Sequence, residues 1–434
     1  MKTKILRGQA LSFKADPFIV GDQASIHYES DGLIFLQDGK VTEFGSYKNL
    51  KDKIPAGAEI KVYTDSLIIP GFVDTHVHYP QTQIIGAYGK QLIDWLNNYT
   101  FIAEQQFADY SHAEKIAKVF VQESLRAGTT TSAVFCTVHP HSVDAIFEEA
   151  QKLNLRMVAG KVLMDRNAPA ALTDTAQSAY DDSKALIKKW HGKGRLSYAV
   201  TPRFAPTSSP EQLELAGALW KESPGTYMHT HISENLGEIA WVKDLFPERK
   251  SYLDVYDHYG LVGERSLLAH GVHLTEEEFT RIHKTGACVC HCSTSNEFLG
   301  SGLFPFERAK DKKRPVRVGL GTDIGAGTSF SHLQTMNESY KIAQLQGYSL
   351  SSACAFYLAT KGGANSLYLD DKIGSIAPGM EADLVVLDLK STPLMDFRMS
   401  YCKDIHEVLF ILMTLGDDRA TKAVYVAGTQ VYGE

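Results

Sequence analysis

The fold is decided by a short stretch with the sequence Pro70-Gly71-Phe72-Val73-Asp74-Thr75-His76-Val77-His78. It continues the apolar run Leu67-Ile68-Ile69, and together they predict one buried strand over residues 67–78. Successive side chains of a strand point to opposite faces, so His76 and His78 share a face. Two imidazoles placed in this way can bind one metal ion, and imidazole suits zinc or iron. The alternative is a pair of hydrogen-bonded polar residues at a strand end.

The composition is that of a soluble globular protein. The chain has 434 residues, which exceeds one ordinary domain, and its net charge is -7. That charge argues against a nucleic-acid surface, which usually needs a basic stripe. No run of about 18 apolar residues is present to span a bilayer, and the basic start at residues 1–5 has no apolar run behind it. We therefore expect a cytoplasmic enzyme that binds neither nucleic acid nor membrane.

Cysteine usage argues against a disulfide framework, because six cysteines are few for this length. Three of them alternate along one segment, at Cys288, Cys290 and Cys292. They could form a thiolate metal site or the face of a strand made of small buried residues. We favour the packing interpretation, because zinc thiolate sites more often use a spacer of two to four residues.

The middle of the chain alternates between strand-like and amphipathic helix-like segments. Helix-start patterns support the alternation, with Ser111 and Glu114 at capping-box spacing and Ser209 directly before Pro210. Strand–helix units of this number predict a (β/α)8 barrel of the TIM type. An open doubly wound sheet is the competing architecture, but no Gly-x-Gly-x-x-Gly follows an early strand. The predicted strands cover residues 67–78, 130–136, 156–163, 196–203, 226–231, 266–270, 287–291 and 316–323.

Both ends of the chain differ from this middle part. Residues 1–66 contain short β-like pieces with turn residues between them, and residues 373–434 contain two further apolar strand patterns bounded by turns. Neither end is long enough to form a good core alone. We therefore expect the two ends to pair into one small β-sandwich domain beside a barrel that covers residues 67–372.

Polar side chains follow several of the predicted barrel strands. Barrel enzymes place their catalytic residues at the carboxyl ends of the strands, so these groups are expected to meet on one rim. His229 and His231 share a face of their strand, and alternation alone does not choose between them as metal ligands. The strand ends concerned are His76 with His78, Thr201-Pro202-Arg203-Phe204, His229 to Glu234, Ala269-His270-Gly271 and Gly321-Thr322-Asp323.

These segments together resemble the amidohydrolase superfamily over nearly the whole chain. Further segments are similar to those of the guanine deaminases within it. One departure is Ser293, which follows Cys292 where that family often has proline. The segments that narrow the resemblance are His78-Tyr79-Pro80-Gln81, Asp94-Trp95-Leu96, Tyr99-Thr100-Phe101, Gly128-Thr129-Thr130-Thr131, Thr201-Pro202-Arg203-Phe204, His231-Ile232-Ser233-Glu234-Asn235 and Leu415-Gly416-Asp417-Asp418-Arg419.

The resemblance implies one Zn²⁺ per chain, with Fe²⁺ as the alternative, and a set of metal ligands. The family pattern of histidine followed three residues later by glutamate selects His231 and leaves His229 behind the ligands or in the core. The fourth strand ends in Arg203, whereas two-metal relatives have a modified lysine there, so a single ion is implied. The implied ligands are His76, His78, His231 and Asp323.

The same resemblance implies a reaction, the deamination of guanine to xanthine and ammonia. His270 would orient the attacking water, Asp323 would take its proton, and Glu234 would move protons to and from the substrate. The implied purine-binding residues are Gln81, Arg203, Phe204, His231 and Glu234. For Arg203 the alternative is an ion pair on the rim, and Trp95 and Phe101 either cover the pocket or belong to the core.

Several alternatives remain open at this point. Another deaminase or hydrolase of the superfamily, acting on cytosine, adenosine-type or triazine substrates, would carry similar metal ligands. A non-catalytic scaffold on the same fold is the alternative from a different class, although such proteins typically lack the ligands. The resemblance also suggests a homodimer.

Overall fold

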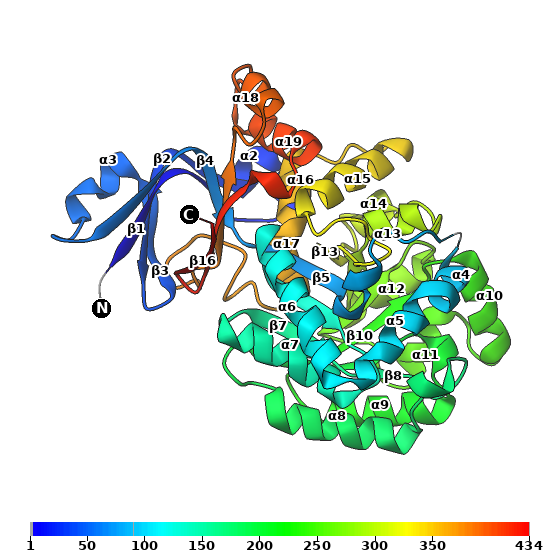
Figure 1. The fold of residues 1–434 in the computed structure, drawn as a ribbon. Helices are drawn as coiled ribbons and strands as arrows, with labels where there is room; N and C mark the ends of the chain where they lie inside the picture. The colour runs from blue at the N-terminus through cyan, green and yellow to red at the C-terminus, as the bar shows by residue number, and fades with distance from the viewer. Residues whose placement is uncertain (1–2, 90, 434) are drawn as a thin grey trace.

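The structure is a computed structural model that describes residues 3–89 and 91–433, and it contains a parallel barrel beside a separate curved sheet (Figure 1). The barrel strands are hydrogen-bonded in chain order, and the short strand β8 (Val162–Leu163) pairs with β9 off this path. The predicted barrel architecture is therefore confirmed. Its strands are β5 (Phe72–His78), β6 (Thr129–Phe135), β7 (Arg156–Gly160), β9 (Leu196–Pro202), β10 (Tyr227–Ile232), β11 (Ser266–His270), β12 (Cys288–His291) and β13 (Arg317–Leu320).

The barrel closes between β5 and the segment that follows β13. The backbone N–H of Asp323 donates to the carbonyl of His76 at 3.0 Å, and the N–H of His78 donates to the carbonyl of Ile324 at 3.1 Å. These bonds bring the carboxyl end of the first strand beside that of the last. Residues far apart in the sequence thus meet at one rim of the barrel.

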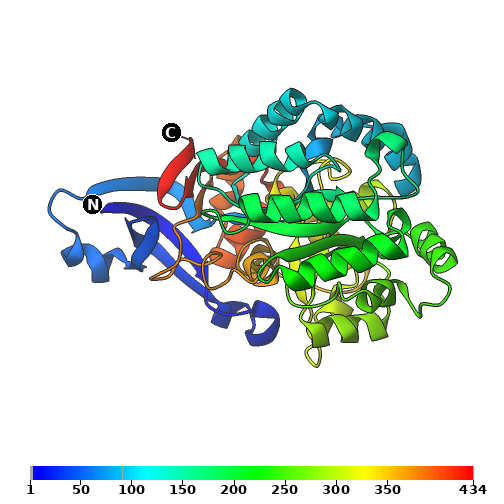
Figure 2. The same cartoon turned by 90° about the horizontal axis from the view of Figure 1, so that it is seen from below.

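Helices surround the barrel on its outside, and Figure 2 shows several of them running alongside the strands. The start predicted at Ser209 is confirmed, because its side chain accepts a hydrogen bond from the N–H of Gln212. The start expected at Ser111 is wrong by two residues. Asp109 caps that helix instead, since its carboxylate accepts from the N–H of Ser111 at 2.9 Å. The main outer helices are α6 (Tyr110–Arg126), α7 (Pro140–Lys152), α8 (Ala176–Trp190), α9 (Pro210–Glu222), α12 (Glu276–Thr285), α15 (His332–Leu345), α16 (Ser352–Ala359) and α19 (Ile405–Leu415).

The two chain ends form the second sheet, as expected. Its strand order is β16-β15-β14-β4-β1-β2-β3, so β14 from the C-terminal part lies directly beside β4 from the N-terminal part. Apolar side chains from both parts, among them Leu6, Ile34, Leu384 and Tyr425, meet in one cluster, and the sheet therefore has a core of its own. The strands are β1 (Lys4–Phe13), β2 (Ile26–Gln37), β3 (Lys40–Ser46), β4 (Glu59–Pro70), β14 (Leu384–Asp388), β15 (Thr421–Val426) and β16 (Thr429–Gly433).

The strand predicted over residues 67–78 is in fact two strands. Its first part belongs to β4, where Leu67 pairs with Leu387 of the end sheet, and only the part from Phe72 onward enters the barrel. Gly71 lies between them, where a Cβ atom would come within 2.2 Å of the Thr130 hydroxyl. Apolar residues continue through both strands, so the sequence pattern could not reveal the break. The division into domains at residues 66 and 372 stays a prediction.

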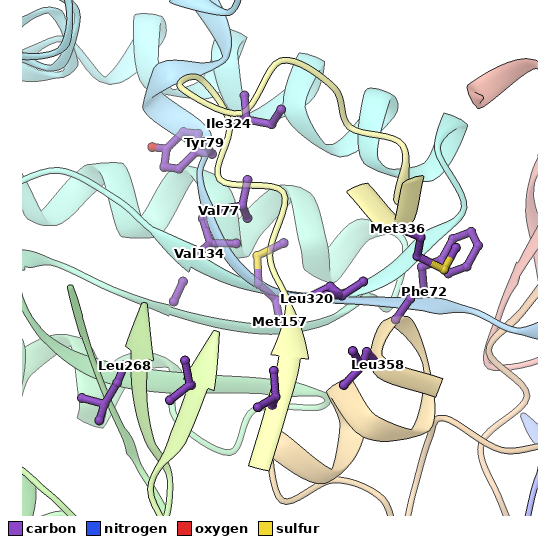
Figure 3. Close-up of a cluster of buried hydrophobic side chains, with 14 of the residues drawn as sticks. Phe72, Val77, Tyr79, Val134, Met157, Leu268, Leu320, Ile324, Met336 and Leu358 are labelled. Carbon is purple, nitrogen blue, oxygen red and sulfur yellow. The ribbon is translucent and has the colours of Figure 1, made fainter. Parts of the chain in front are cut away.

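The hydrophobic core lies between the barrel strands and the helices. Figure 3 shows Val77 and Val134, from neighbouring strands, in one cluster with Met336 of α15 and Leu358 of α16. Side chains alternate along β5, and Val77 points outward to the helices. His76 and His78 therefore point toward the inside of the barrel. Within the described ranges, no helix combines the length and the apolar character needed to cross a membrane.

The barrel interior below the rim is filled by small and aromatic side chains. Cys288 and Cys290 belong to a cluster there with Val73, Val158 and Tyr227. The packing interpretation of these two cysteines is therefore confirmed. A filled interior makes the barrel a solid support for the side chains at its rim.

Candidate active site

Three imidazoles and one carboxylate converge at the carboxyl ends of the barrel strands. The Nε2 atom of His78 lies 3.1 Å from Nε2 of His231 and 3.4 Å from Oδ1 of Asp323. Nε2 of His76 lies 3.2 Å from the same carboxylate oxygen. The possible ligand atoms of the three histidines all lie within 4.8 Å of one another. These are the residues that the sequence predicted as metal ligands, and the structure brings them together.

The protonation states of these residues fit a metal ion. Burial lowers the pKa of His76, and it lowers the pKa values of His78 and His231 further, which favours the neutral form of the three imidazoles. The Nδ1–H of His231 donates to the carbonyl of Arg203 at 2.7 Å, which leaves a lone pair on Nε2. Nε2 of His76 has no hydrogen-bond partner among the described residues. Neutral nitrogens with free lone pairs are the form of histidine that binds zinc.

The carboxylate of the group is ionised. Burial would raise the pKa of Asp323, but the neighbouring His76 and His270 hold that pKa below its ordinary value. Three neutral nitrogens and one carboxylate oxygen form a donor set typical of a catalytic zinc site, which keeps a coordination position for water or substrate. The donor set therefore fits the metal implied by the sequence.

His229 contacts a predicted ligand and is not itself in the ligand group. Its Nε2 lies 2.8 Å from Nδ1 of His76. It precedes His231 by two residues on β10, so it lies roughly 6–7 Å deeper in the barrel. A hydrogen bond at Nδ1 orients the ring of His76 and fixes which of its nitrogens faces the group. The structure thus gives His229 a place behind the ligands.

Glu234 and His270 lie beside the ligand group as the sequence predicted. Nε2 of His270 is 3.4 Å from Oε2 of Glu234 and 3.8 Å from Oδ2 of Asp323. Burial raises the pKa of Glu234 to about 7. A carboxyl group with such a pKa can both hold and release a proton near neutral pH. Burial would lower the pKa of His270, but the carboxylates of Glu234 and Asp323 raise it above its ordinary value.

Two side chains that the sequence analysis missed hold these groups in place. The Nδ1–H of His270 donates to Oδ1 of Asn296 at 2.9 Å. The hydroxyl of Ser301 donates to Oε1 of Glu234 at 3.0 Å. Both residues follow β12, and the polar run from Ser293 to Asn296 is the only local signal that could have drawn attention to them.

The backbone at the rim adopts uncommon conformations. His270 has a φ of 71°, Asp323 a φ of 49° and Ser233 a φ of 47°. Residues other than glycine rarely occupy the left-handed region, and such strain clusters at active sites. Here it occurs at the carboxyl end of β11 and within three residues of the ends of β10 and β13, beside the ligand group.

A pocket opens beside the ligand group, and its lining contains the expected substrate-binding residues. Gln81, Arg203 and Phe204 line it together with His231 and Glu234. The rest of the lining is mainly apolar and includes Trp95, which also belongs to a buried hydrophobic cluster, so the structure fits both the cover and the core interpretation of that residue. Phe101 lies behind Arg203, whose guanidinium carbon is 5.6 Å from the centre of the ring. The apolar lining residues are Leu92, Trp95, Leu96, Leu299 and Ala326.

Arg203 satisfies both interpretations that the sequence left open. It lines the pocket, and its Nη1 also donates to Oε2 of Glu104 at 2.7 Å, which makes a buried ion pair. Glu104 was missed although it comes only three residues after Phe101, the last residue of the segment Tyr99-Thr100-Phe101. Its partner is 99 positions further along the chain, and no local pattern links the two.

Two other residues near the rim fit a packing role better than a ligand role. Cys292 lies close to His76, His270 and Asp323, but burial raises the pKa of its thiol well above the ordinary value. A protonated thiol is a poor metal ligand, because the thiolate is the binding form. His291 packs its ring against Phe304 with centroids 4.5 Å apart, as expected of a packing residue.

Comparisons with known proteins agree with this geometry. Residues 67–431 match the model of the Amidohydrolase family. The guanine deaminase of Escherichia coli (strain K12) is 53% identical over 409 residues, which cover 94% of this chain and 93% of that protein. The solved E. coli guanine deaminase superposes with a TM-score of 0.95 at 49% identity, covering 100% of both chains. A guanine deaminase from C. acetobutylicum, solved with guanine bound in the active site, gives a TM-score of 0.89 at 33% identity, covering 99% of this chain and 100% of that one.

Proposed function

The chain belongs to the amidohydrolase family, and from this premise we propose that it hydrolyses guanine to xanthine and ammonia. It is then a hydrolase that acts on a C–N bond of a cyclic amidine. The main support for the proposal is that four side chains converge beside a pocket lined by Arg203. They are His76, His78, His231 and Asp323. Guanine deaminases with high identity over nearly the full length, one of them with guanine in its active site, support the substrate.

The proposal includes one zinc ion per chain, with iron(II) as the alternative. His76, His78, His231 and Asp323 would hold it. When bound, the ion lowers the pKa of a water molecule to about 7 and so supplies hydroxide at neutral pH. The end of β9 offers Arg203, which cannot bridge two metals, and this supports a single ion.

The protein side chains supply the proton transfers in this proposal. Asp323 takes a proton from the attacking water as the new C–O bond forms at C2 of the purine. Glu234 gives its proton to N3. The proton held by Asp323 then passes to the amine, which leaves as ammonia, and Glu234 takes up the proton of the new hydroxyl at C2 as the carbonyl of xanthine forms. His270 lies between both carboxylates and orients the water. General acid–base transfer of this kind contributes typically about 10²–10⁴-fold.

In this proposal the substrate is recognised by the side chains on the other wall of the pocket. The guanidinium of Arg203 has fixed donors suited to the carbonyl at C6, and the amide of Gln81 can both donate and accept. The ring of Phe204 offers a flat surface for the purine, and the apolar side chains around it keep water out. We also propose a homodimer and a role in cytoplasmic purine catabolism, both on family resemblance.

The test is a substrate panel with metal removed and restored. Purified protein is stripped with a chelator, reloaded with zinc or iron(II), and assayed for ammonia release from guanine, cytosine, adenosine and a triazine. Guanine alone should be turned over, and only by the reloaded protein. Preferred release of ammonia from another substrate would replace guanine in the proposal. A metal-loaded protein without any turnover would identify a scaffold instead. Size-exclusion chromatography with light scattering tests the homodimer.

A further inference from the structure

Glu104 is a completely buried carboxylate in the helix α5 (Phe101–Gln105), beside the substrate side of the pocket. Oε2 accepts a hydrogen bond from Nη1 of Arg203 at 2.7 Å, and Oε1 lies 3.5 Å from Nε2 of Gln81. The other end of the same amide is also held, because the N–H of Gly325 donates to Oε1 of Gln81 at 3.3 Å. One carboxylate thus contacts both residues proposed to recognise the purine.

These contacts permit only one orientation of the Gln81 amide. A carboxylate only accepts hydrogen bonds, and a backbone N–H only donates them. The NH₂ group of Gln81 must therefore face Glu104, and its oxygen must face Gly325. One hydrogen of the NH₂ group and one lone pair of the oxygen remain for other partners. Without the carboxylate, only the contact to Gly325 would set the orientation.

Glu104 also holds the guanidinium of Arg203 in place. The side chain of Arg203 is 3% exposed and that of Glu104 is 0% exposed, so the pair is shielded from water. A buried arginine without its partner would be strongly disfavoured, the more so near a site for a divalent cation. The planar guanidinium presents fixed donors only while one of its edges is held.

We propose that Glu104 is a positioning residue that fixes the donor pattern of Arg203 and Gln81, and so selects purines with a carbonyl at C6 over those with an amine. This inference rests on the proposed deamination of guanine. A carbonyl oxygen at C6 accepts from the fixed donors, whereas an amine at that position would place donor against donor. A site built to bond one polar group rejects an analogue that leaves its polar groups unpaired.

The test compares guanine with 2,6-diaminopurine, which carries the same amine at C2 and an amine at C6. In Glu104→Gln the new amide brings a donor to a place where Arg203 and Gln81 both require an acceptor. The KM for guanine should rise by roughly 10- to 100-fold, while kcat falls by less. The preference for guanine over 2,6-diaminopurine, measured as the ratio of kcat/KM values, should fall by about 10-fold or more. Metal content should match that of the unaltered protein.

Two further variants make the test decisive. Glu278→Gln removes another buried carboxylate, which accepts from the N–H groups of Leu253 and Thr275 and is not among the residues that line the pocket. It should leave KM and the preference unchanged. Glu104→Asp keeps the charge on a shorter side chain, and its KM and its preference should lie between those of the unaltered protein and of Glu104→Gln. It also tests the proposal if the Glu104→Gln protein does not fold.

The outcomes separate the two proposals. Unaltered, metal-loaded protein that does not deaminate guanine would overturn the proposed function itself. If the unaltered protein is active and folded Glu104 variants lose kcat equally for both purines, with KM and the preference unchanged, Glu104 has a structural role only and the positioning role is overturned.

Discussion

The two ends of the barrel both bury charged and titratable groups, but they arrange them differently. At the amino ends of the strands, Arg156 and Arg195 meet Glu381 and Asp383, which lead into β14 of the end sheet. Arg156 Nε donates to Glu381 at 3.2 Å, Arg195 Nη2 lies 2.7 Å from the same carboxylate, and Arg195 also pairs with Asp383. At the carboxyl ends, three neutral imidazoles and Asp323 point at one another.

The difference shows what each end does. The amino end matches two cations with two carboxylates, so its charges cancel within the protein and join the barrel to the end sheet. The carboxyl end collects lone pairs and a negative charge, which a cation from outside the chain must balance. In barrels of this type the first arrangement serves stability and the second serves chemistry. Mutations at the two ends should therefore affect different measurements.

The largest effect is expected from removing a ligand at the carboxyl end. His231→Ala leaves three of the four donors, so metal should be lost and deamination should fall by at least about 10³-fold, because water keeps its ordinary acidity without the ion. Metal analysis and ammonia release measure the two quantities. Undiminished deamination by a metal-free His231→Ala protein would contradict the proposed site.

Glu234→Gln tests the proton transfer without touching a ligand. The amide has nearly the same shape but cannot carry the proton, so kcat should fall by about 10²–10⁴-fold while metal content is retained. Rapid-quench or steady-state assays of guanine conversion give kcat. Turnover at the rate of the unaltered protein would remove Glu234 from the mechanism.

Arg195→Ala breaks the network at the amino end. It leaves the carboxylate of Asp383, which is 2% exposed, without its arginine, and unfolding free energy should drop by about 3–5 kcal/mol. Once folded, the variant should keep the kcat/KM of the unaltered protein. Denaturant unfolding and a guanine assay measure both. A loss of activity without a loss of stability would mean that the two ends are not separate in function.

The stability loss in Arg195→Ala should also depend on pH. Burial would raise the pKa of Glu381, but Arg156 and Arg195 hold that pKa below its ordinary value. A carboxylate with a lowered pKa in the folded state stabilises fully above its unfolded pKa, and the stabilisation is lost as pH falls through the folded value. The difference in unfolding free energy between the two proteins should therefore shrink below about pH 4.

The smallest effect is expected from the residue behind the ligands. His229→Leu removes the hydrogen-bond partner of His76 and should weaken metal affinity by about 10–100-fold, with activity restored at high metal concentration. Competition with a chelator measures the affinity. A matched change at the packing residue, His291→Leu, should leave metal affinity unchanged, and equal weakening in both variants would point to loosened packing instead.

Much of the rim could be predicted from the sequence because its information is local. His76 and His78 share a face by strand alternation, and His231, His270 and Asp323 are each the last residue of a predicted strand. Glu104 and Asn296 could not be found in this way, since their roles depend on partners brought near by the closed barrel. The break at Gly71 was hidden because one apolar run serves two different sheets. The ion pair of Arg195 with Asp383 joins residues 188 positions apart.

The interleaved end sheet has a consequence for synthesis of the chain. Pro70 pairs with Leu384, so β4 has no partner on this edge until synthesis has passed β14, after all the barrel strands. Until then one edge of β4 offers unpaired backbone groups, which invite pairing with another nascent chain. Late pairing of distant segments also slows folding. A truncation before β14 should therefore yield insoluble material even though every barrel strand is present. The first and last strands, β1 and β16, both belong to this sheet, which lies beside the barrel (Figures 1 and 2).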